Sequence, residues 1–319
     1  MLKLAILNDY QHAALKMADW PVLQDRCRIE VFDRNLEVPD EAARELADFH
    51  ILCPVRARMP MPRALIGKLP NLQFIAITGV INRTLDLQAL ADRGIPASVT
   101  GRRGQGAHAT PELVWGLILA SARHIPLEDR NMRRGVWQST IGTTLTGRVL
   151  GLLGLGRIGH RMAEIGAAFG MEVIAWSQNL TKETATSAGV KWVDKETLLK
   201  SSDFLSVHLV LGKRSRGLIG APELALMKPS AFLINSARGP IIEEAALIDA
   251  LQAGRIQGAG LDVYDIEPMA PDHPFLKMDN VVLTPHLGFV ADDSYRVYYE
   301  DSVENILAFL DGNSIRLAY

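Results

Sequence analysis

The sequence predicts an α/β protein built on parallel β-sheets. Short runs of apolar and β-branched residues alternate with helical patterns along most of the 319 residues, which is typical of βαβ units. A glycine-rich turn follows one of these runs near the middle of the chain. The last helical stretch, SVENILAFLDG, is too short to form a domain alone, so we expect it to pack onto the N-terminal part.

The glycine-rich turn Gly154-Leu-Gly156-Arg-Ile-Gly159 matches the pattern G-x-G-x-x-G between a strand and a helix. We expect Gly154 to make the tight turn, Gly156 to admit a pyrophosphate, and Gly159 to let the helix pack closely. The N–H groups of Arg157 and Ile158 would point at the phosphates from the positive end of the helix. Strand, turn and helix fall in register, which favours NAD or NADP binding over a turn without a ligand.

The predicted strands form two series. The first comprises residues 2–7, 50–55 and 73–78, and the second comprises residues 147–154, 172–177, 204–210, 231–237, 256–263 and 281–286. Six strands with intervening helices complete a dinucleotide-binding sheet. We therefore expect two Rossmann-like domains. The cofactor domain, 101–288, is a doubly wound parallel sheet inserted into a smaller flavodoxin-like substrate domain, 1–100 and 289–319. Helices are expected from Pro39 and from Pro111.

Composition disfavours several other classes of protein. The chain has 48% hydrophobic and 22% charged residues and a net charge of −2, with isolated basic pairs at Arg102–Arg103 and Arg133–Arg134, so we expect no nucleic acid partner. No apolar stretch reaches the ~18 residues of a membrane span, and the N-terminal apolar run is too short for a signal peptide. Cys27 and Cys53 are expected to be buried free thiols, and we expect a cytoplasmic protein without a metal site.

The segment EVIAWSQNLT lies about 20 residues after the turn, where a carboxylate normally hydrogen-bonds the adenosine ribose. Here the strand is followed by Ser177, Gln178 and Asn179, without a carboxylate. Ser177 can donate to a phosphate oxygen, Gln178 is a neutral donor, and Lys182 would add a charge if the loop curls back. We expect relaxed selectivity between NAD and NADP, with NADP slightly favoured.

Three further stretches place polar residues after apolar strands. LINSARGPIIEE contains Arg238, AGLDVYDIEP contains Asp262 and Glu267, and VVLTPHLGF contains His286. Because the carboxyl ends of strands line the ligand crevice of an open α/β sheet, we expect Arg238, Glu267 and His286 to converge. Each residue alone is explained by a structural role, such as a surface ion pair or a hydrogen-bonded residue of the core. Their occurrence together, after a dinucleotide turn in the chain, favours a catalytic site.

These motifs resemble the D-isomer-specific 2-hydroxyacid dehydrogenase family. The resemblance covers roughly residues 50–310 and rests on LTGRVLGLLGLGRIGHRM, INSARGPIIEEAALIDAL, GAGLDVYDIEP and VVLTPHLG, in that order. It implies a homodimeric oxidoreductase, similar to glyoxylate and hydroxypyruvate reductases, that transfers a hydride between NAD(P)H and a 2-oxo acid or D-2-hydroxy acid. It also implies the discontinuous two-domain layout.

The resemblance implies a role for each polar residue. His286 would be the acid/base, Glu267 would pair with it and favour its charged form, and Arg238 would hold the carboxylate and carbonyl oxygens of the oxo acid. His208 would lie at the cofactor edge and Asp262 near the nicotinamide carboxamide. A purely structural role remains open for both.

The first part of the chain supplies the expected substrate contacts. Arg56, in PVRARMP, lies in the family's first substrate loop. Gly79 and Val80, in AITGVIN, match a loop whose N–H groups receive the substrate carboxylate. Two aromatic residues, Phe289 and Tyr295, follow the catalytic histidine where many members have small residues. They either re-line the pocket, favouring an apolar or aromatic 2-oxo acid, or cap the domain interface.

The loop after the strand at 204–210 departs from the family. SVHLVLGKRS replaces the frequent SxHxPLT, with Val210 in place of proline, so this loop near the cofactor can follow another path.

Two alternative functions share parts of the pattern. A formate dehydrogenase moves no hydroxyl proton, so the presence of Glu267 argues against it. A cofactor-sensing, corepressor-like binding protein can keep the catalytic triad, but such proteins usually carry long low-complexity tails that this chain lacks. The particular 2-hydroxy acid stays open, with glyoxylate, hydroxypyruvate and aryl-pyruvates as candidates.

Overall fold

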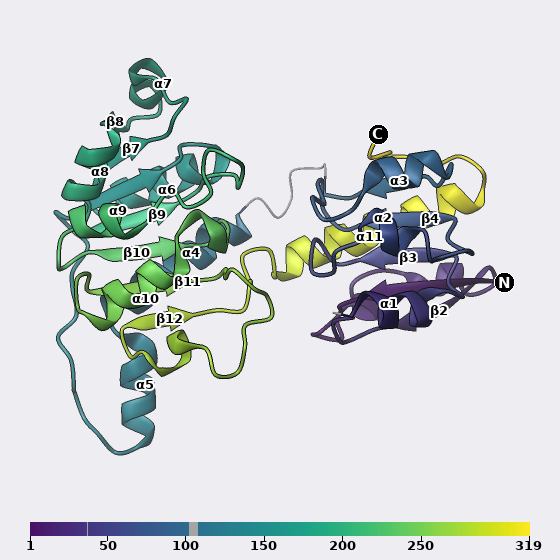
Figure 1. Ribbon diagram of the computed structural model, residues 1–319, viewed down its shortest axis with the longest axis horizontal. Coiled ribbons are helices and arrows are strands. Elements are labelled where there is room, and N and C mark those ends of the chain that lie inside the picture. Colours follow the sequence, from purple (N-terminus) through teal and green to yellow (C-terminus); the bar gives the residue numbers. More distant parts are fainter. Residues whose placement is uncertain (37, 102–107) are drawn as a thin grey trace. The chain divides into compact units, whose positions relative to one another are not determined.

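The computed structural model describes residues 1–36, 38–101 and 108–319. The chain divides into two compact units, Met1–Ala107 with Val290–Tyr319, and His108–Phe289. Each unit has its own parallel sheet and its own hydrophobic core (Figure 1). The basic pair Arg102–Arg103 lies outside the described residues.

The first unit contains a five-stranded parallel sheet in the order β2-β1-β3-β4-β5. This is the flavodoxin-like order. The strands are β1 Leu2–Leu7, β2 Cys27–Val31, β3 Ile51–Pro54, β4 Phe74–Ile77 and β5 Ala97–Val99. The sequence predicts β1, β3 and β4, which are apolar and largely buried. It misses the two edge strands, because β2 is only partly buried and β5 has three residues.

Helices surround this sheet, and the last of them comes from the C-terminus. They are η1 Ala14–Lys16, η2 Trp20–Leu23, α1 Pro39–Leu46, α2 Arg63–Ile66, α3 Leu87–Asp92 and α11 Asp292–Leu310. Helix α11 packs against β4, where Phe309 stacks on Phe74 with ring centroids 4.5 Å apart. Asn305 of the same helix donates to the carbonyl of Val99 at 3.1 Å. The C-terminal helix therefore completes the core of the first unit.

The second unit contains a seven-stranded parallel sheet in the order β12-β11-β10-β9-β6-β7-β8. The strands are β6 Val149–Leu153, β7 Glu172–Trp176, β8 Lys191–Trp192, β9 Phe204–Val207, β10 Phe232–Asn235, β11 Gly258–Leu261 and β12 Val281–Leu283. All six expected strands are present, and the sequence misses only the two-residue edge strand β8. The chain order reverses between β6 and β9, which is the switch point where doubly wound sheets bind ligands.

Helices cover both faces of the second sheet. They are α4 Ala109–Ala122, α5 Ile125–Arg133, α6 Arg157–Ala168, α7 Lys182–Ser187, α8 Lys195–Ser201, α9 Ala221–Leu226 and α10 Glu244–Gln252, with the short turns η3 Gly239–Ile241 and η4 Pro274–Lys277. Apolar residues of α4 and α6 share one core with the sheet, and those of α8, α9 and α10 share another. The predicted α/β fold of two Rossmann-like units is confirmed.

The strand register brings the carboxyl ends of the strands to one edge of the second sheet. Leu153 pairs with Trp176 on one side and Val207 on the other. Further along, Leu261 pairs with Asn235 and Leu283. The segments that follow these strands therefore emerge side by side, and they carry every candidate cofactor and catalytic residue of this unit.

Both cysteines are buried and free, as the sequence predicts. Burial raises the pKa of the Cys53 thiol to about 12, so this thiol stays protonated and unreactive at neutral pH. Within the described ranges, no helix combines the length and apolarity needed to cross a membrane. The same ranges contain no group of three or more His, Cys, Asp or Glu residues arranged to hold a metal ion.

Candidate active site

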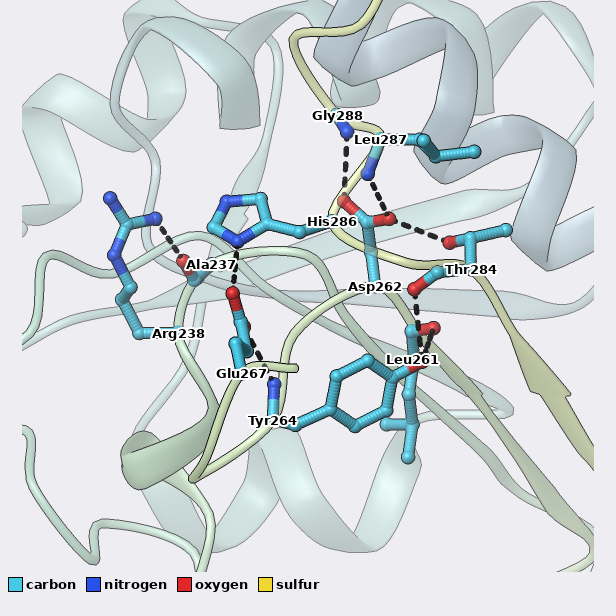
Figure 2. Close-up of polar contacts among 10 residues, drawn as sticks. All are labelled: Ala237, Arg238, Leu261, Asp262, Tyr264, Glu267, Thr284, His286, Leu287 and Gly288. Carbon is cyan, nitrogen blue, oxygen red and sulfur yellow. Dashed lines mark hydrogen bonds and ion pairs between the residues drawn. The ribbon is translucent and has the colours of Figure 1, made fainter. Parts of the chain in front are cut away.

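His286 and Glu267 form a close pair at the carboxyl edge of the second sheet. His286 follows β12, Glu267 follows β11, and His286 Nδ1 lies 2.5 Å from Glu267 Oε2 (Figure 2). The two side chains are 32% and 33% exposed, so ligands can reach them. Burial raises the pKa of Glu267, but the hydrogen bond and charge of His286 outweigh it and hold that pKa below its usual range. Glu267 is therefore ionised at neutral pH.

The Glu267 carboxylate also selects the tautomer of the imidazole. Its second oxygen, Oε1, accepts the N–H of Tyr264 at 3.0 Å, which fixes the carboxylate in place. Because Nδ1 of His286 faces a negative charge, Nδ1 carries a proton. In the neutral imidazole, Nε2 then carries the lone pair.

The backbone of His286 is held in an unusual conformation by Asp262. The φ of His286 is +54°, a left-handed value that is uncommon outside glycine. Asp262 is fully buried and accepts the N–H groups of Leu287 at 2.7 Å and Gly288 at 2.9 Å. It also accepts the hydroxyl of Thr284 at 2.6 Å (Figure 2). These bonds hold the chain on both sides of His286 and maintain its strained conformation.

The three hydrogen bonds of Asp262 offset the free-energy cost of burying its charged carboxylate. Burial raises the pKa of Asp262, and the three hydrogen bonds oppose that shift. Beside it, the hydroxyl of Tyr264 lies 3.1 Å from the carbonyl of Leu261 and 2.9 Å from that of Thr284. The structure thus gives Asp262 a positioning task for His286. Its role near the nicotinamide carboxamide stays a prediction.

Arg238 follows β10 and lies near the acid/base pair. Its Nη1 donates to the carbonyl of Ala237 at 2.6 Å, and its charge contributes to lowering the pKa of Glu267. The turn before it is shaped by Asn235, which accepts the N–H of Ala237 and donates to the carbonyl of Arg238, both at 3.0 Å. The structure thus brings Arg238, Glu267 and His286 together.

The loop of Arg238 is also pressed directly against the loop that carries Glu267. A Cβ placed on Gly239 would lie 2.1 Å from the carbonyl carbon of Tyr264. Only glycine permits this approach of two backbones.

The glycine turn after β6 has the geometry that a dinucleotide needs. Gly154 has a φ of +109°, and a Cβ on Gly159 would lie 2.3 Å from the carbonyl oxygen of Gly154. Packing therefore requires glycine at Gly159, whereas a Cβ on Gly156 would meet nothing within 4 Å. Helix α6 begins at Arg157 without a side-chain cap. The space beside Gly156, at the positive end of this helix, fits a pyrophosphate.

The remaining cofactor candidates lie at the ends of β7 and β9. Ser177 is half-buried, and Gln178 is exposed and donates to the carbonyl of Arg214 at 2.8 Å. The ammonium of Lys182 lies 5.2 Å from the ring centre of Trp192, which pairs with Ala175 beside the end of β7. A role for Lys182 at the ribose stays a prediction.

His208, after β9, lies 2.9 Å from the hydroxyl of Ser206 through its Nε2. Desolvation by the surrounding protein lowers the pKa of His208 to about 4, so this imidazole is neutral at pH 7.

The expected substrate residues of the first unit lie together. Arg56 has a φ of +55°, and its N–H donates to the hydroxyl of Thr78 at 2.7 Å. Its guanidinium lies against Gly79, where a Cβ would be 2.1 Å from Nη1. The N–H of Gly79 donates to the hydroxyl of Thr100 at 2.6 Å, so a substrate would compete with Thr100 for it. Val80 is 46% exposed.

The two aromatic residues after the histidine have different surroundings. Phe289 is buried, and its ring contacts that of His286 edge to face with centroids 5.8 Å apart. Tyr295 lies in the core of the first unit, where its hydroxyl donates to Gln11 at 3.1 Å and its ring packs on Tyr299. Phe289 thus contacts the acid/base ring, whereas Tyr295 stabilises its own unit.

Sequence reasoning missed several residues that shape the site. Thr284, Asn235 and Tyr264 hold the loops that carry the polar groups, as described above. Each is a polar or amphipathic side chain within three residues of the carboxyl end of an apolar strand, which is the signal that could have identified them.

Comparison with known proteins agrees with this geometry. Residues 115–288, more than half of the chain, match the family model described as D-isomer specific 2-hydroxyacid dehydrogenase, NAD binding domain. A glyoxylate reductase from Aeropyrum pernix is 37% identical, over 89% of this chain and 87% of that protein. A D-3-phosphoglycerate dehydrogenase from Archaeoglobus fulgidus is 40% identical over 78% of this chain, but the match spans only 47% of that protein.

Solved structures give the same result. The crystal structure of a phosphoglycerate oxidoreductase from Vibrio cholerae has a TM-score of 0.91 and 33% identity, covering 98% of this chain and all of that one.

A doubly wound sheet with a dinucleotide turn and an acid/base pair at one edge defines a nicotinamide-dependent oxidoreductase. The chain belongs to the D-isomer specific 2-hydroxyacid dehydrogenase family. The family and enzyme class predicted from the sequence are confirmed, and the formate dehydrogenase and corepressor alternatives are not favoured.

The bonds of Asp262 can be tested by the substitution Asp262→Asn. The amide places an N–H₂ group against backbone donors, so at least one buried donor loses its acceptor, at a cost of roughly 1–3 kcal/mol in the free energy of unfolding. We expect a lower Tm in thermal unfolding. The control is Asp265→Asn, at an exposed aspartate three positions further on. Equal Tm values for the two variants would contradict the positioning role.

The low pKa of His208 predicts a pH dependence of stability. The folded pKa of about 4 lies below the unfolded value of about 6.5, so the unfolded chain binds more protons between these values. The free energy of unfolding therefore falls as the pH drops through this window. We expect His208→Gln to lose less Tm than the wild type between about pH 7 and about pH 5. His12→Gln, at an exposed histidine, should behave as the wild type.

Proposed function

We propose that this chain reduces small 2-oxo acids, such as glyoxylate or hydroxypyruvate, with NAD(P)H, and oxidises D-2-hydroxy acids in reverse. The single observation that supports this most is the pairing of His286 and Glu267 at 2.5 Å, on the sheet edge that also carries the glycine turn. Reduction of a 2-oxo acid needs a proton donor beside a hydride source, and this edge can supply both. The relatives named above, which include a glyoxylate reductase, support the substrate class.

The proposed proton donor is His286 Nε2. When bound, the reduced nicotinamide supplies a hydride to C2 of the oxo acid. His286 donates a proton to the carbonyl oxygen, so that C=O becomes CH–OH, and the ionised Glu267 stabilises the imidazolium before transfer. In the oxidative direction, the neutral Nε2 accepts the hydroxyl proton. The one-third exposure of His286 allows it to exchange protons with solvent between turnovers.

Arg238 is proposed to orient the oxo acid. Its planar guanidinium presents parallel N–H donors that suit the carboxylate and carbonyl oxygens together. Its proximity to Glu267 supports this role, because it lies beside the proton donor. Arg56, Gly79 and Val80 are proposed as further substrate contacts on the strength of the family resemblance.

The proposed cofactor residues are those of the turn and the neighbouring strand ends. The N–H groups of Arg157 and Ile158 would hold the pyrophosphate beside Gly156, where the structure leaves room. Ser177 and Gln178 would face the adenosine ribose, and His208 and Asp262 the nicotinamide side. With no carboxylate after β7 to repel a 2′-phosphate, we propose a preference for NADPH over NADH.

A homodimer is also proposed, and exposed apolar residues of the second unit support it. Helix α5 and the segment after it expose Met132 (62%), Trp137 (71%) and Ile141 (95%). Exposed Met and Trp side chains favour an interface, because both residue types are enriched at interfaces. The two buried free thiols support a reducing, cytoplasmic location.

The proposed function is tested by the variants His286→Ala and Glu267→Gln with glyoxylate and hydroxypyruvate. Loss of the proton donor should lower kcat by roughly 10²–10⁴-fold while cofactor Kd stays unchanged, because His286 acts in the chemical step. Glu267→Gln should lower kcat less and alter its pH profile. Wild-type protein that binds NADPH but reduces no 2-oxo acid would contradict the proposal, as would full activity of His286→Ala.

The dimer is tested by Trp137→Glu in light scattering. A charge within the proposed interface should convert a dimer to a monomer, whereas Leu15→Glu, at an exposed leucine of the first unit, should leave the dimer intact. A monomeric wild type would contradict the proposal.

A further inference from the structure

The segment that would recognise the adenosine ribose, after β7, contacts a second loop. This loop, residues 208–217, follows β9, and its Arg214 lies 35 positions beyond Asn179 in the chain. Gln178 donates from its side chain to the carbonyl of Arg214 at 2.8 Å. In return, Arg214 Nη1 donates to Asn179 Oδ1 at 3.3 Å. The two bonds place a guanidinium at the end of β7, where many dinucleotide enzymes have a carboxylate.

We propose that Arg214 binds the 2′-phosphate of NADPH and is the main determinant of a preference for NADPH. The inference rests on the proposed function in one respect, that a dinucleotide binds at the glycine turn. It assigns the phosphate contact to the loop after β9 instead of the segment after β7 or Lys182.

The loop after β9 is built to hold Arg214 in place. Ser215 is buried, and its hydroxyl donates to the carbonyl of Val210 at 2.7 Å and accepts the N–H of Gly212 at 2.9 Å. The N–H of Arg216 donates to the carbonyl of Gly212 at 3.0 Å. These bonds close a compact turn around Ser215, so the backbone at Arg214 is fixed against the strand end.

The charges at this place favour a phosphate. Residues 208–217 contain Lys213, Arg214 and Arg216 but no Asp or Glu, and residues 176–182 also lack a carboxylate. A 2′-phosphate at the end of β7 would therefore be attracted by the guanidinium of Arg214, without an opposing carboxylate from these two segments. Arg214 is exposed, so a phosphate can reach it.

The guanidinium suits this task better than the other cations. It carries five N–H donors, so the bond to Asn179 orients the guanidinium and leaves other donors for a phosphate. Its planar fork matches two phosphate oxygens. Lys182 lies over the ring of Trp192, 5.2 Å from its centre, whereas Arg214 is hydrogen-bonded to Asn179 in the segment after β7. A carboxylate at this position would instead bind the ribose hydroxyls and repel the phosphate.

The test is the affinity of the purified chain for NADP⁺ and NAD⁺, measured by calorimetry in wild type, Arg214→Ala and Asn179→Asp. We expect Arg214→Ala to weaken NADP⁺ binding by roughly tenfold or more, the range for a hydrogen bond to a charged group, while NAD⁺ affinity stays unchanged. Adenosine 2′,5′-bisphosphate, which lacks the nicotinamide, should lose affinity in parallel. Asn179→Asp should act in the same direction, because it pairs Arg214 with a carboxylate. Lys182→Ala is the matched control and should change neither affinity.

An unchanged ratio of NADP⁺ to NAD⁺ affinity in Arg214→Ala would overturn the inference, as would a selective loss of NADP⁺ binding in Lys182→Ala. Failure of the proposed function has a different signature. A wild type that reduces no 2-oxo acid, but whose NADP⁺ affinity depends on Arg214, would retain the inference and reject the substrate class. A wild type that binds neither dinucleotide would overturn both.

Discussion

The site depends on one buried carboxylate. Asp262 sits at the end of β11 and accepts two backbone N–H groups directly beyond His286. These bonds act together with the N–H of His286, which donates to the carbonyl of Thr284 at 3.1 Å, to hold His286 in its left-handed conformation beside Glu267. A carboxylate can serve in this way because it accepts several bonds at once, whereas no neutral side chain of this size offers as many acceptor positions. The arrangement of His286 and Glu267 is therefore supported by an interaction in the interior.

The order of strands separates two tasks along one edge of the second sheet. On one side of the switch point, the segments after β6 and β7 carry the glycine turn and the residues proposed to face the ribose. On the other side, the segments after β10, β11 and β12 carry Arg238, Glu267 and His286. Only the loop after β9 lies between the two groups in the sheet order, and it contacts the first of them through Arg214. The proposed contacts to the pyrophosphate and the ribose and the proposed catalytic residues thus follow separate strands of one sheet.

Which strands and which site contacts the sequence could predict depends on how buried each strand is and on whether the contact follows from strand pairing. The central strands are continuous apolar runs, so they are visible in the sequence, whereas β2, β5 and β8 are short edge strands with a weak pattern. The meeting of Arg238, Glu267 and His286 follows from parallel pairing, because each comes after one of three adjacent strands. The contact of Arg214 with Asn179 does not follow from any strand pattern; it depends on the path of a loop and on the hydroxyl of Ser215. The two bonds from Asp262 to the N–H groups of Leu287 and Gly288 could not be predicted either, because they involve backbone groups.

The approach of Gly239 to Tyr264 links two functions that the chain encodes separately. The residue that precedes Gly239 is proposed to orient the oxo acid, and the N–H of Tyr264 holds the carboxylate of the acid/base pair. Any side chain at position 239 would push the two loops apart and shift both groups together. A substitution at position 239 that moved the loop of Arg238 to suit a new substrate would therefore also move the Glu267 carboxylate and disturb proton transfer. Changes of substrate range in this protein should arise at positions remote from this contact, where one loop can vary without moving the other.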